Sequence, residues 1–259
     1  MKVHQWRIKR KYYDLLLAGA KRYEVRVRYG SLRKVAVGDQ VVFSDYSDRK
    51  FTIKSIKSYD KFADIEEAAG DIIPGANREE MLNTLYSIYP ADKEALGVYV
   101  FELEPPHGLL YLSKLVGKPS FKKVADELYA LTDWICEDYP QHKEHYYGKY
   151  LNGLSVGARE VIGYYIGTKP VGIAILKKDI WEKKISTLFV DPAYRGKGIA
   201  SRLVSASIHF LGNSFPVITI ADYKVPQFEG LIKKFGWTHT ETLPKEYYNG
   251  KHEEWVYNS

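Results

Sequence analysis

The chain has 259 residues, of which 45% are hydrophobic and 27% charged, and its formal net charge is +6. This composition argues against a disordered chain, and the length suits two domains of ordinary size. The single cysteine, Cys136, excludes an internal disulfide, and no apolar run approaches the roughly 20 residues that span a bilayer. We therefore expect a cytoplasmic protein without a membrane segment.

Positive charge is concentrated at the N-terminus. Residues 1–34 hold eleven basic and two acidic residues, an excess of nine, so the rest of the chain is net acidic by three. Such an asymmetry favours a polyanionic partner for the first part of the chain. A solvated basic surface without a specific partner is the alternative.

The first hundred residues indicate short strands with two helices. A helix is expected over 11–18, ended by Gly19. The strand over 21–30 alternates, with tyrosine and valine on one face and arginine and glutamate on the other. Further strands are expected at 41–43, 51–56 and 98–103, and a helix at 78–88. We predict a small open barrel or mixed β domain, with Tyr23 and Tyr29 in its core.

The run Glu104-Pro105-Pro106-His107-Gly108 breaks any regular element, which divides the chain into domains at 1–106 and 107–259. The second domain is predicted to hold a mixed central sheet flanked by helices. Strands are expected at 109–115, 160–166, 170–176, 184–190, 217–220 and 254–257, and helices at 120–135, 197–211 and 226–235.

One segment of the second domain has the pattern of an anion site. A buried strand at 188–190 leads through Asp191-Pro192 and Arg195-Gly196-Lys197-Gly198 into a helix. Free N–H groups at a helix N-terminus attract anions, and glycine lets the backbone approach a phosphate closely. This segment therefore predicts phosphate binding, although a glycine-rich turn can also serve tight packing alone.

The second domain resembles the GNAT acetyltransferase superfamily, because Arg195, Gly198 and Ala200 match the motif Arg/Gln-x-x-Gly-x-Gly/Ala and Gly236-Trp237 matches the end of the family's last helix. The resemblance implies acetyl-CoA, or another short acyl-CoA, as co-substrate and no metal. Its pyrophosphate would lie on the amides of residues 196–201 and its pantetheine along residues 188–190, as an added strand. The implied cofactor residues are Leu188, Phe189, Val190, Arg195, Gly196, Lys197, Gly198, Ile199, Ala200 and Ser201.

The catalytic groups of this family are not matched. Ile232 stands at the usual position of the acidic tyrosine, and residues 185–188 hold no carboxylate base. Catalysis then depends either on positioning alone or on another acid. Tyr223 and Asp222, directly after the apolar strand, are the nearest candidates.

The first domain resembles ASCH domains, relatives of the PUA fold, because Gly19 to Arg26 matches Gly-x-Lys-x-x-Glu-x-Arg. The resemblance implies binding of RNA or a modified nucleoside, with Lys21, Arg22, Glu24, Arg26 and Arg28 as the binding residues. Glu24 lies between Arg22 and Arg26 on one face of the strand, so these side chains are expected either to form a structural ion network or to line a cleft in which the arginines bind phosphate. Some relatives are amidohydrolases, but Glu24 stands where their threonine would be, so we do not expect hydrolysis.

Three functions fit these patterns. The first is an N-acetyltransferase whose acceptor amine is presented by the ASCH domain on RNA or on another translation-related substrate. The second is a small-molecule amine acetyltransferase with a regulatory ASCH domain. The third is a non-catalytic acyl-CoA sensor. The acceptor, the acyl chain length and the oligomeric state are left open by the sequence.

Overall fold

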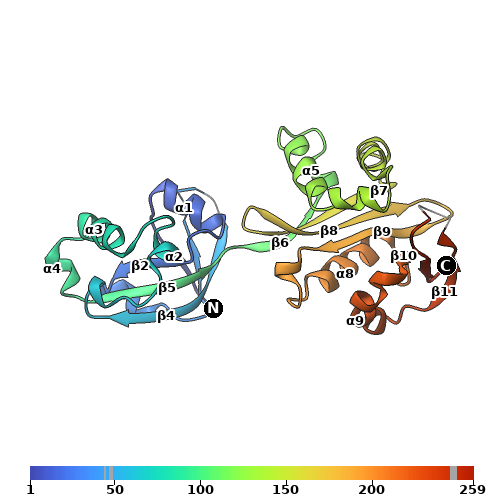
Figure 1. Cartoon of the computed structure of the whole chain (residues 1–259). Helices are drawn as coiled ribbons and strands as arrows, with labels where there is room; N and C mark the ends of the chain where they lie inside the picture. Colours follow the sequence, from blue (N-terminus) through green and yellow to red (C-terminus); the bar gives the residue numbers. More distant parts are fainter. Residues whose placement is uncertain (44, 47–48, 246–249) are drawn as a thin grey trace. The chain divides into compact units, whose positions relative to one another are not determined.

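The computed structural model describes residues 1–43, 45–46, 49–245 and 250–259. It divides into two compact units, Met1–His107 with Ile166–Lys169, and Gly108–Tyr165 with Pro170–Ser259 (Figure 1). In the part of the chain that the model describes, no helix is both long and apolar enough to cross a membrane.

The first unit is a mixed, open sheet of five strands with helices around it. The strand order is β1 (Val3–Gln5), β3 (Gln40–Val42), β4 (Lys50–Tyr59), β5 (Val98–Glu104) and β2 (Tyr23–Val27). β1 runs parallel to β3, whereas β3, β4, β5 and β2 pair antiparallel. The helices are α1 (Arg10–Leu17), α2 (Ala69–Ile72), α3 (Arg78–Ile88) and α4 (Ala91–Glu94).

Two apolar clusters make the core of this unit. One joins α1 to β3, β4 and β5 around Phe43, Phe51 and Phe101, and the other joins α3 to β2 around Val25 and Val27. The alternation of β2 is as predicted on this second face, where Tyr23 also packs. Tyr29 is a correction: it lies beyond the end of β2 and is 41% exposed.

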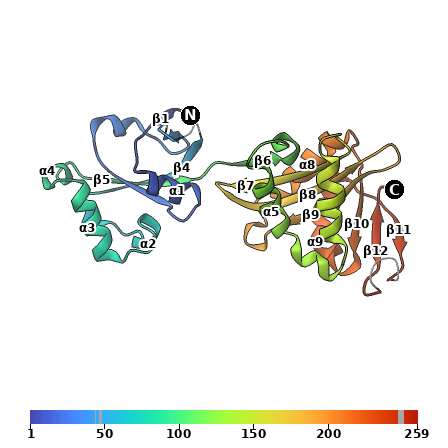
Figure 2. The ribbon, with the colours of Figure 1, turned by 90° about the horizontal axis from the view of Figure 1, so that it is seen from above.

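The second unit is a seven-stranded sheet with helices on both faces (Figures 1 and 2). The order is β11 (His239–Leu243), β12 (Glu254–Tyr257), β10 (Val217–Ala221), β9 (Lys183–Val190), β8 (Lys169–Lys178), β7 (Arg159–Ile166) and β6 (His107–Tyr111). β9 and β10 are parallel, and β8–β9, β10–β12 and β11–β12 are antiparallel. This is the predicted mixed central sheet.

Figure 1 shows α5 (Phe121–Ala130) and the helical segment 142–153 on one side of this sheet, and α8 (Ile199–Leu211) and α9 (Val225–Phe235) on the other. The segment 142–153 consists of α6 (His142–Glu144), a π-helix (His145–Tyr150) and α7 (Leu151–Gly153). α8 and α9 both end at a glycine in the left-handed region, Gly212 and Gly236, as their sequences predict.

The first helix of this unit is shorter than predicted. α5 ends at Ala130, and Ile135 belongs to a separate 3-10 helix, Asp133–Glu137. The Thr132 hydroxyl donates a hydrogen bond to the Tyr129 carbonyl at 3.0 Å, so a side chain competes with the helical backbone at this point. Ser120 occupies the N-cap position but makes no side-chain cap bond.

Candidate functional site

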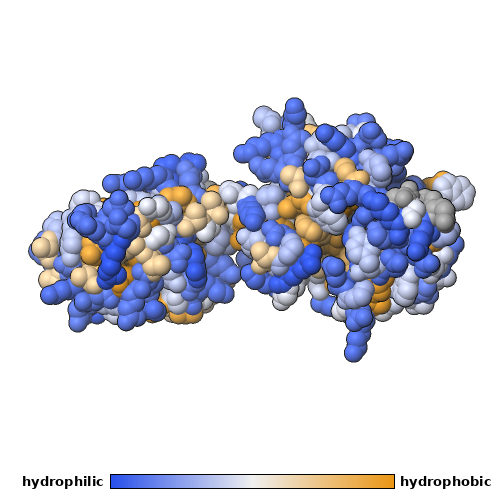
Figure 3. Space-filling model, in the orientation of Figure 1, coloured by the Kyte–Doolittle hydropathy of each residue, from blue (hydrophilic) through white to orange (hydrophobic). Residues whose placement is uncertain are grey.

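The two central strands of the second unit, β9 and β10, are paired at their N-terminal ends and separate towards their C-terminal ends. β9 and β10 pair at Lys184–Val217 and Ile185–Ile218. Beyond these pairs β9 continues against β8, and β10 continues against β12. A cavity of about 1030 Å³ is lined by both strands along this stretch, by residues 186–190 of β9 and 219–221 of β10. Figure 3 shows hydrophobic surface, in orange, within a hollow of this unit.

A β-bulge lies in β9 where the separation begins. Ile175 faces Thr187 and Leu176 faces Ile185, so Ser186 is the extra residue of β9. Bulges bend a strand and increase its twist, which turns β9 away from β10. A molecule with backbone-like amides fits between such strands, because their facing polar groups can bond it as an added strand.

At the far end of β9 the chain forms a cradle of backbone amides. The Asp191 carboxylate accepts a hydrogen bond from the Ala193 amide at 3.0 Å and shapes a 3-10 turn, Pro192–Tyr194. Gly196 and Gly198 follow with φ of 75° and 76°, a conformation that favours glycine. Gly198 is the N-cap of α8 and supplies no side chain there, so the first amides of the helix are available for an anion.

Arg195 holds this loop in place. Its Nε donates to the Val190 carbonyl at 3.1 Å, and its guanidinium lies 3.4 Å from Oε1 of Gln227 on α9. These contacts link the end of β9 to α9, and both Arg195 and Gln227 line the cavity. The motif arginine thus has a positioning contact in addition to its charge.

The cavity gathers nine of the ten residues that the sequence assigns to the cofactor: Leu188, Phe189, Val190, Arg195, Gly196, Gly198, Ile199, Ala200 and Ser201. The tenth, Lys197, lies with its ammonium 5.2 Å from the centre of the Tyr194 ring. The geometry therefore suits a long ligand with an anionic group at the start of α8.

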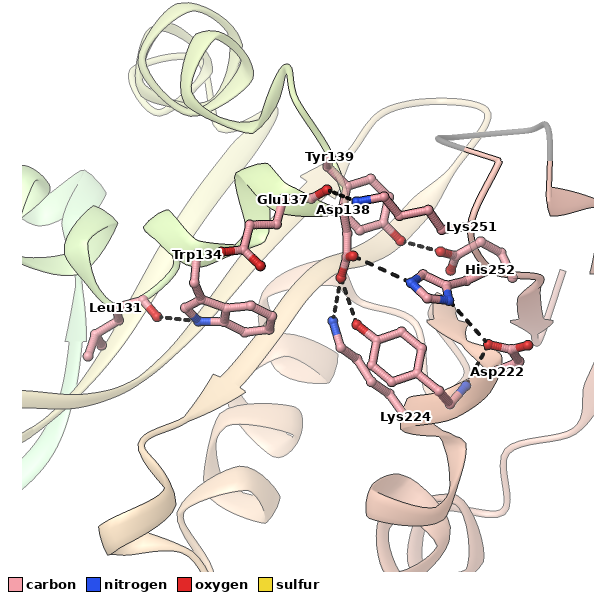
Figure 4. A network of polar contacts seen from close by, with 11 residues as sticks. Leu131, Trp134, Glu137, Asp138, Tyr139, Asp222, Lys224, Lys251 and His252 are labelled. Carbon is pink, nitrogen blue, oxygen red and sulfur yellow. Dashed lines mark hydrogen bonds and ion pairs between the residues drawn. The ribbon is translucent and has the colours of Figure 1, made fainter.

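The two catalytic candidates from the sequence belong to a polar network beside the cavity (Figure 4). Tyr223 and Asp222 lie in the 3-10 turn Asp222–Lys224 that follows β10. The Tyr223 hydroxyl donates to Asp138 at 2.7 Å, and the Lys224 ammonium pairs with the same oxygen at 3.1 Å. Burial and the Asp138 carboxylate raise the pKa of Tyr223, which makes it a weaker acid than a free tyrosine.

His252 completes this network. Its Nε2 lies 3.6 Å from Asp138 and its Nδ1 lies 3.9 Å from Asp222, and its ring packs on Tyr223 with centroids 4.4 Å apart. Within the 3-10 turn Asp222–Lys224, Lys224 lines the cavity, whereas the Tyr223 side chain is 47% exposed. The network thus braces the segment 137–139 against the end of β10.

A second acid–base pair lies nearer to the cavity. Tyr139 lines the cavity and donates a 2.6 Å hydrogen bond to Oε1 of Glu254, which is 3% exposed. Oε2 of Glu254 has no hydrogen-bond partner among the described residues, and burial raises the pKa of this carboxyl. Glu254 faces Ala221 across the β10–β12 pair. The sequence did not predict this pair. Its one indication in the sequence was the carboxylate of Glu254 in a strand of otherwise apolar residues.

Tyr150 is another group that the sequence did not single out. It ends the π-helix and lines the cavity. Burial raises its pKa, and a hydrogen bond with Ser186, the bulge residue, opposes that shift. π-helical turns are often found at functional sites, and this one brings a phenol to the point where β9 and β10 part.

In the first unit, the residues predicted to bind nucleic acid contact one another and acidic residues from other parts of the unit. Lys21 is buried, lies 3.4 Å from Glu24, and donates to the Tyr23 and Ile72 carbonyls. Glu24 also pairs with Arg26 at 2.9 Å.

The other two arginines of this strand region have partners outside it. Arg22 pairs with Glu102 at 3.1 Å, and Arg28 pairs with Asp60 at 3.2 Å. These pairs set acidic residues from outside residues 1–34 against part of the positive excess of that segment. We refer to Arg22, Arg26 and Arg28 as the strand arginines.

A cavity of about 400 Å³ in the first unit is lined by Trp6, Arg7, Arg26, Tyr29 and neighbouring residues. The Arg26 guanidinium lies over the Trp6 ring, 4.9 Å from its centre, and its buried Nε has no hydrogen-bond partner among the described residues. An aromatic ring beside a cation with a free donor suits a planar, polar ligand.

Comparison with known proteins assigns both units. The model of the acetyltransferase (GNAT) family matches residues 128–221, and the model of the ASCH domain matches residues 7–107. None of the curated proteins matches the chain.

Among solved structures, the hypothetical protein PH0355 is 28% identical over 40% of this chain and 99% of its own, with a TM-score of 0.38. Protein PF0455 from Pyrococcus furiosus is 25% identical over 40% of this chain and 97% of its own, with a TM-score of 0.36. A putative streptothricin acetyltransferase from Bacillus anthracis, in complex with acetyl coenzyme A, is 16% identical over 42% of this chain and 67% of its own, with a TM-score of 0.37. From the two family models, the chain contains an N-terminal ASCH domain and a C-terminal domain of the GNAT acetyltransferase family.

Proposed function

We propose that the protein is an N-acetyltransferase that transfers the acetyl group of acetyl-CoA to an amine. The observation that carries this proposal is the separation of β9 and β10 beside the glycine cradle at the start of α8. In this proposal the cradle amides of residues 196–201 bind the pyrophosphate. The pantetheine amides bond to the free edge of β9 at residues 188–190.

Aminolysis of the thioester needs a base for the amine and an acid for the departing thiolate. Two pairs are candidates, Tyr139 with Glu254 and Tyr223 with Asp138, and Asp222 supports the second through its contact with His252. The first pair has the better chemistry, because its tyrosine lines the cavity and its carboxyl has a free oxygen and a raised pKa. We infer that Glu254 takes the ammonium proton through Tyr139, whose hydroxyl passes its own proton to Glu254 as it receives one. After the amine has attacked the thioester, the Tyr139 hydroxyl gives a proton to the departing coenzyme A thiolate and takes one back from Glu254.

The binding test uses two glycines at opposite ends of α8. Gly198 and Gly212 have φ of 76° and 61°, and an added Cβ meets no atom within 4 Å at either position. Gly198→Glu should abolish acetyl-CoA binding in calorimetry, because its side chain and charge enter the phosphate site. Gly212→Glu carries the same backbone strain and should bind as the wild type does. Unchanged affinity in a folded Gly198→Glu variant would refute the assignment.

The activity test measures release of free coenzyme A from acetyl-CoA in the presence of polyamines, amino acids, peptides or tRNA. Release that depends on one amine class identifies the acceptor. Binding of acetyl-CoA without release with any of these would favour the non-catalytic sensor.

Two acceptors are proposed for this reaction. In one, the ASCH domain presents an RNA-linked amine. In the other, the acceptor is a small amine and the ASCH domain is regulatory. The internal ion pairs of the strand arginines favour the second, because a paired arginine gains less from binding a phosphate. The exposed residues Arg7, Lys9, Lys11, Arg33 and Lys34 keep a basic surface available to the first.

A further inference from the structure

Four lysines face one another across the outer end of the β8–β9 hairpin. Lys177 is the cross-strand partner of Lys184, and Lys178 is the partner of Lys183. Neighbours along a strand point to opposite faces, so each face of the sheet has one lysine pair. Like charges directly opposite each other are unfavourable in an antiparallel pair. Each pair therefore needs compensating negative charge.

One pair finds its compensation at the end of α8. The Lys178 ammonium donates to the Phe210 carbonyl at 2.9 Å, and the Lys183 ammonium lies 3.5 Å from the Gly212 carbonyl. These carbonyls belong to the C-terminal end of the helix, where the dipole is negative. Both charges on this face are thus accounted for within the fold.

In the other pair, Lys177 and Lys184, only Lys177 has acidic partners at ion-pair distance in the described part of the chain. Lys177 pairs with Glu182 at 2.6 Å and with Asp179 at 3.3 Å. Lys184 has no carboxylate within ion-pair distance in the described part of the chain. It is half-buried and lines the cavity between β9 and β10. Burial lowers its pKa, as expected for an ammonium without a partner.

The negative charges of Glu182 and Glu254 act on Lys184, but neither carboxylate forms an ion pair with it in the described part of the chain. Glu182 is held by Lys177. Glu254 accepts its hydrogen bond from Tyr139, and burial raises its pKa. A cation left uncompensated in a cavity wall is unfavourable unless a ligand supplies the missing charge.

The position of Lys184 argues against coenzyme A as the ligand that supplies this charge. Lys184 lies six residues from Val190, where the glycine cradle begins, which is roughly 20 Å along an extended strand. The cradle already offers the phosphates their own amides and Arg195. Lys184 instead belongs to the paired stretch of β9 and β10, near the end of β9 that is remote from the cradle.

We propose that Lys184 binds an anionic group, a carboxylate or a phosphate, carried by the amine that accepts the acetyl group. This inference rests on the proposed acetyl transfer and narrows its substrate to small amines that bear a negative charge. The ammonium of Lys184 would bond this group directly, near the end of β9 that is remote from the cradle.

The test titrates three probe amines into the full-length protein saturated with coenzyme A. The probes are O-phosphoethanolamine, β-alanine and propylamine, which carry a phosphate, a carboxylate and no anionic group. Calorimetry of the wild type should show one of the first two binding about 10-fold to 100-fold more tightly than propylamine, the usual worth of a charged hydrogen bond. Whichever of these two probes binds more tightly shows whether the site prefers a phosphate or a carboxylate.

Lys184→Met should remove this preference, and Lys183→Met is its matched control, because Lys183 is the next residue of the same strand and bonds to the end of α8. Retained preference in Lys184→Met, equal loss in both variants, or no binding of either anionic probe would overturn the inference. Failure of the wild type to bind coenzyme A in the first step would instead refute the proposed function itself.

Discussion

Gly172 of β8 lies against the first two turns of α8. A Cβ added there would lie 3.1 Å from Cγ2 of Ile199, 3.1 Å from Cδ1 of Leu203 and 3.3 Å from the Phe189 carbonyl oxygen. Gly172 also faces Val190, the last residue of β9. We predict that Gly172→Ala shifts the start of α8 and with it the cradle for the pyrophosphate.

The size of the effect follows from these contacts. Overpacking by one carbon costs about 1–3 kcal/mol, and replacing a glycine of ordinary φ with alanine returns about 0.4–1 kcal/mol through the unfolded chain. The net loss of stability is then roughly 0.5–2 kcal/mol, or a few degrees in the unfolding midpoint. Displacement of the amides by a few tenths of an ångström should weaken acetyl-CoA binding by about tenfold, or ~1.4 kcal/mol.

Gly163→Ala is the control for this experiment. Its added Cβ would lie 2.6 Å from Cδ2 of Leu128 and 2.8 Å from the Tyr165 ring, so it strains the packing against α5. We expect both variants to melt at lower temperature in calorimetric scans and only Gly172→Ala to lose affinity for acetyl-CoA in titration. Equal affinities within twofold, with both variants folded, would refute the proposed coupling between the β8–α8 contact and the cradle.

Three further predictions concern acid–base chemistry, pH and RNA. Glu254→Gln should lower turnover with the identified acceptor by about 10²-fold, whereas Tyr223→Phe should stay within a few-fold of the wild type. The reverse result would assign the proton transfer to Tyr223 and the Asp138 network. Asp39 has its pKa lowered to about 2 by bonds from His4, Lys2 and Ala36, so its contribution to stability is present above about pH 4 and is lost as the pH falls towards 2. Unfolding midpoints of Asp39→Asn should therefore depend less on pH across that window, and an unaltered dependence would contradict this. If the strand arginines bind RNA, the variant with all three replaced by alanine should lose tRNA binding and keep acetyl-CoA binding. For the wild type, the log–log slope of tRNA affinity against salt concentration should be about −2 to −4. An unaltered slope in the variant would exclude these arginines as the phosphate contacts.

The regular elements could be predicted where local chemistry decides them. α9 follows from Pro226 at its start and Gly236 at its end, and α3 has the predicted bounds of 78–88. The segment 142–153 was not predicted, because Gly148 and several tyrosines are poor helix formers. Its helices are held by packing of Tyr146 and Tyr147 against Tyr129, which only the tertiary fold supplies.

The candidate site divides in the same way. The cradle is one continuous segment, so its glycines and Arg195 could be read from their spacing. Tyr139 and Glu254 are 115 positions apart, and only the pairing of β10 with β12 brings the carboxylate to the cavity. The strand arginines illustrate the opposite error, since their alternation is visible in sequence, but the acidic partners of Arg22 and Arg28 come from distant parts of the sequence.

The separation of β9 and β10 also has a mechanical consequence. The seven-stranded sheet is joined across its middle by two residue pairs, Lys184–Val217 and Ile185–Ile218. Two paired positions hold fewer backbone hydrogen bonds than the seven of β8 with β9, so we expect the sheet to bend more easily between β9 and β10 than between β8 and β9. We therefore expect a ligand bound between β9 and β10 to restrict this bending, because it would bond to both strands where they do not bond to each other.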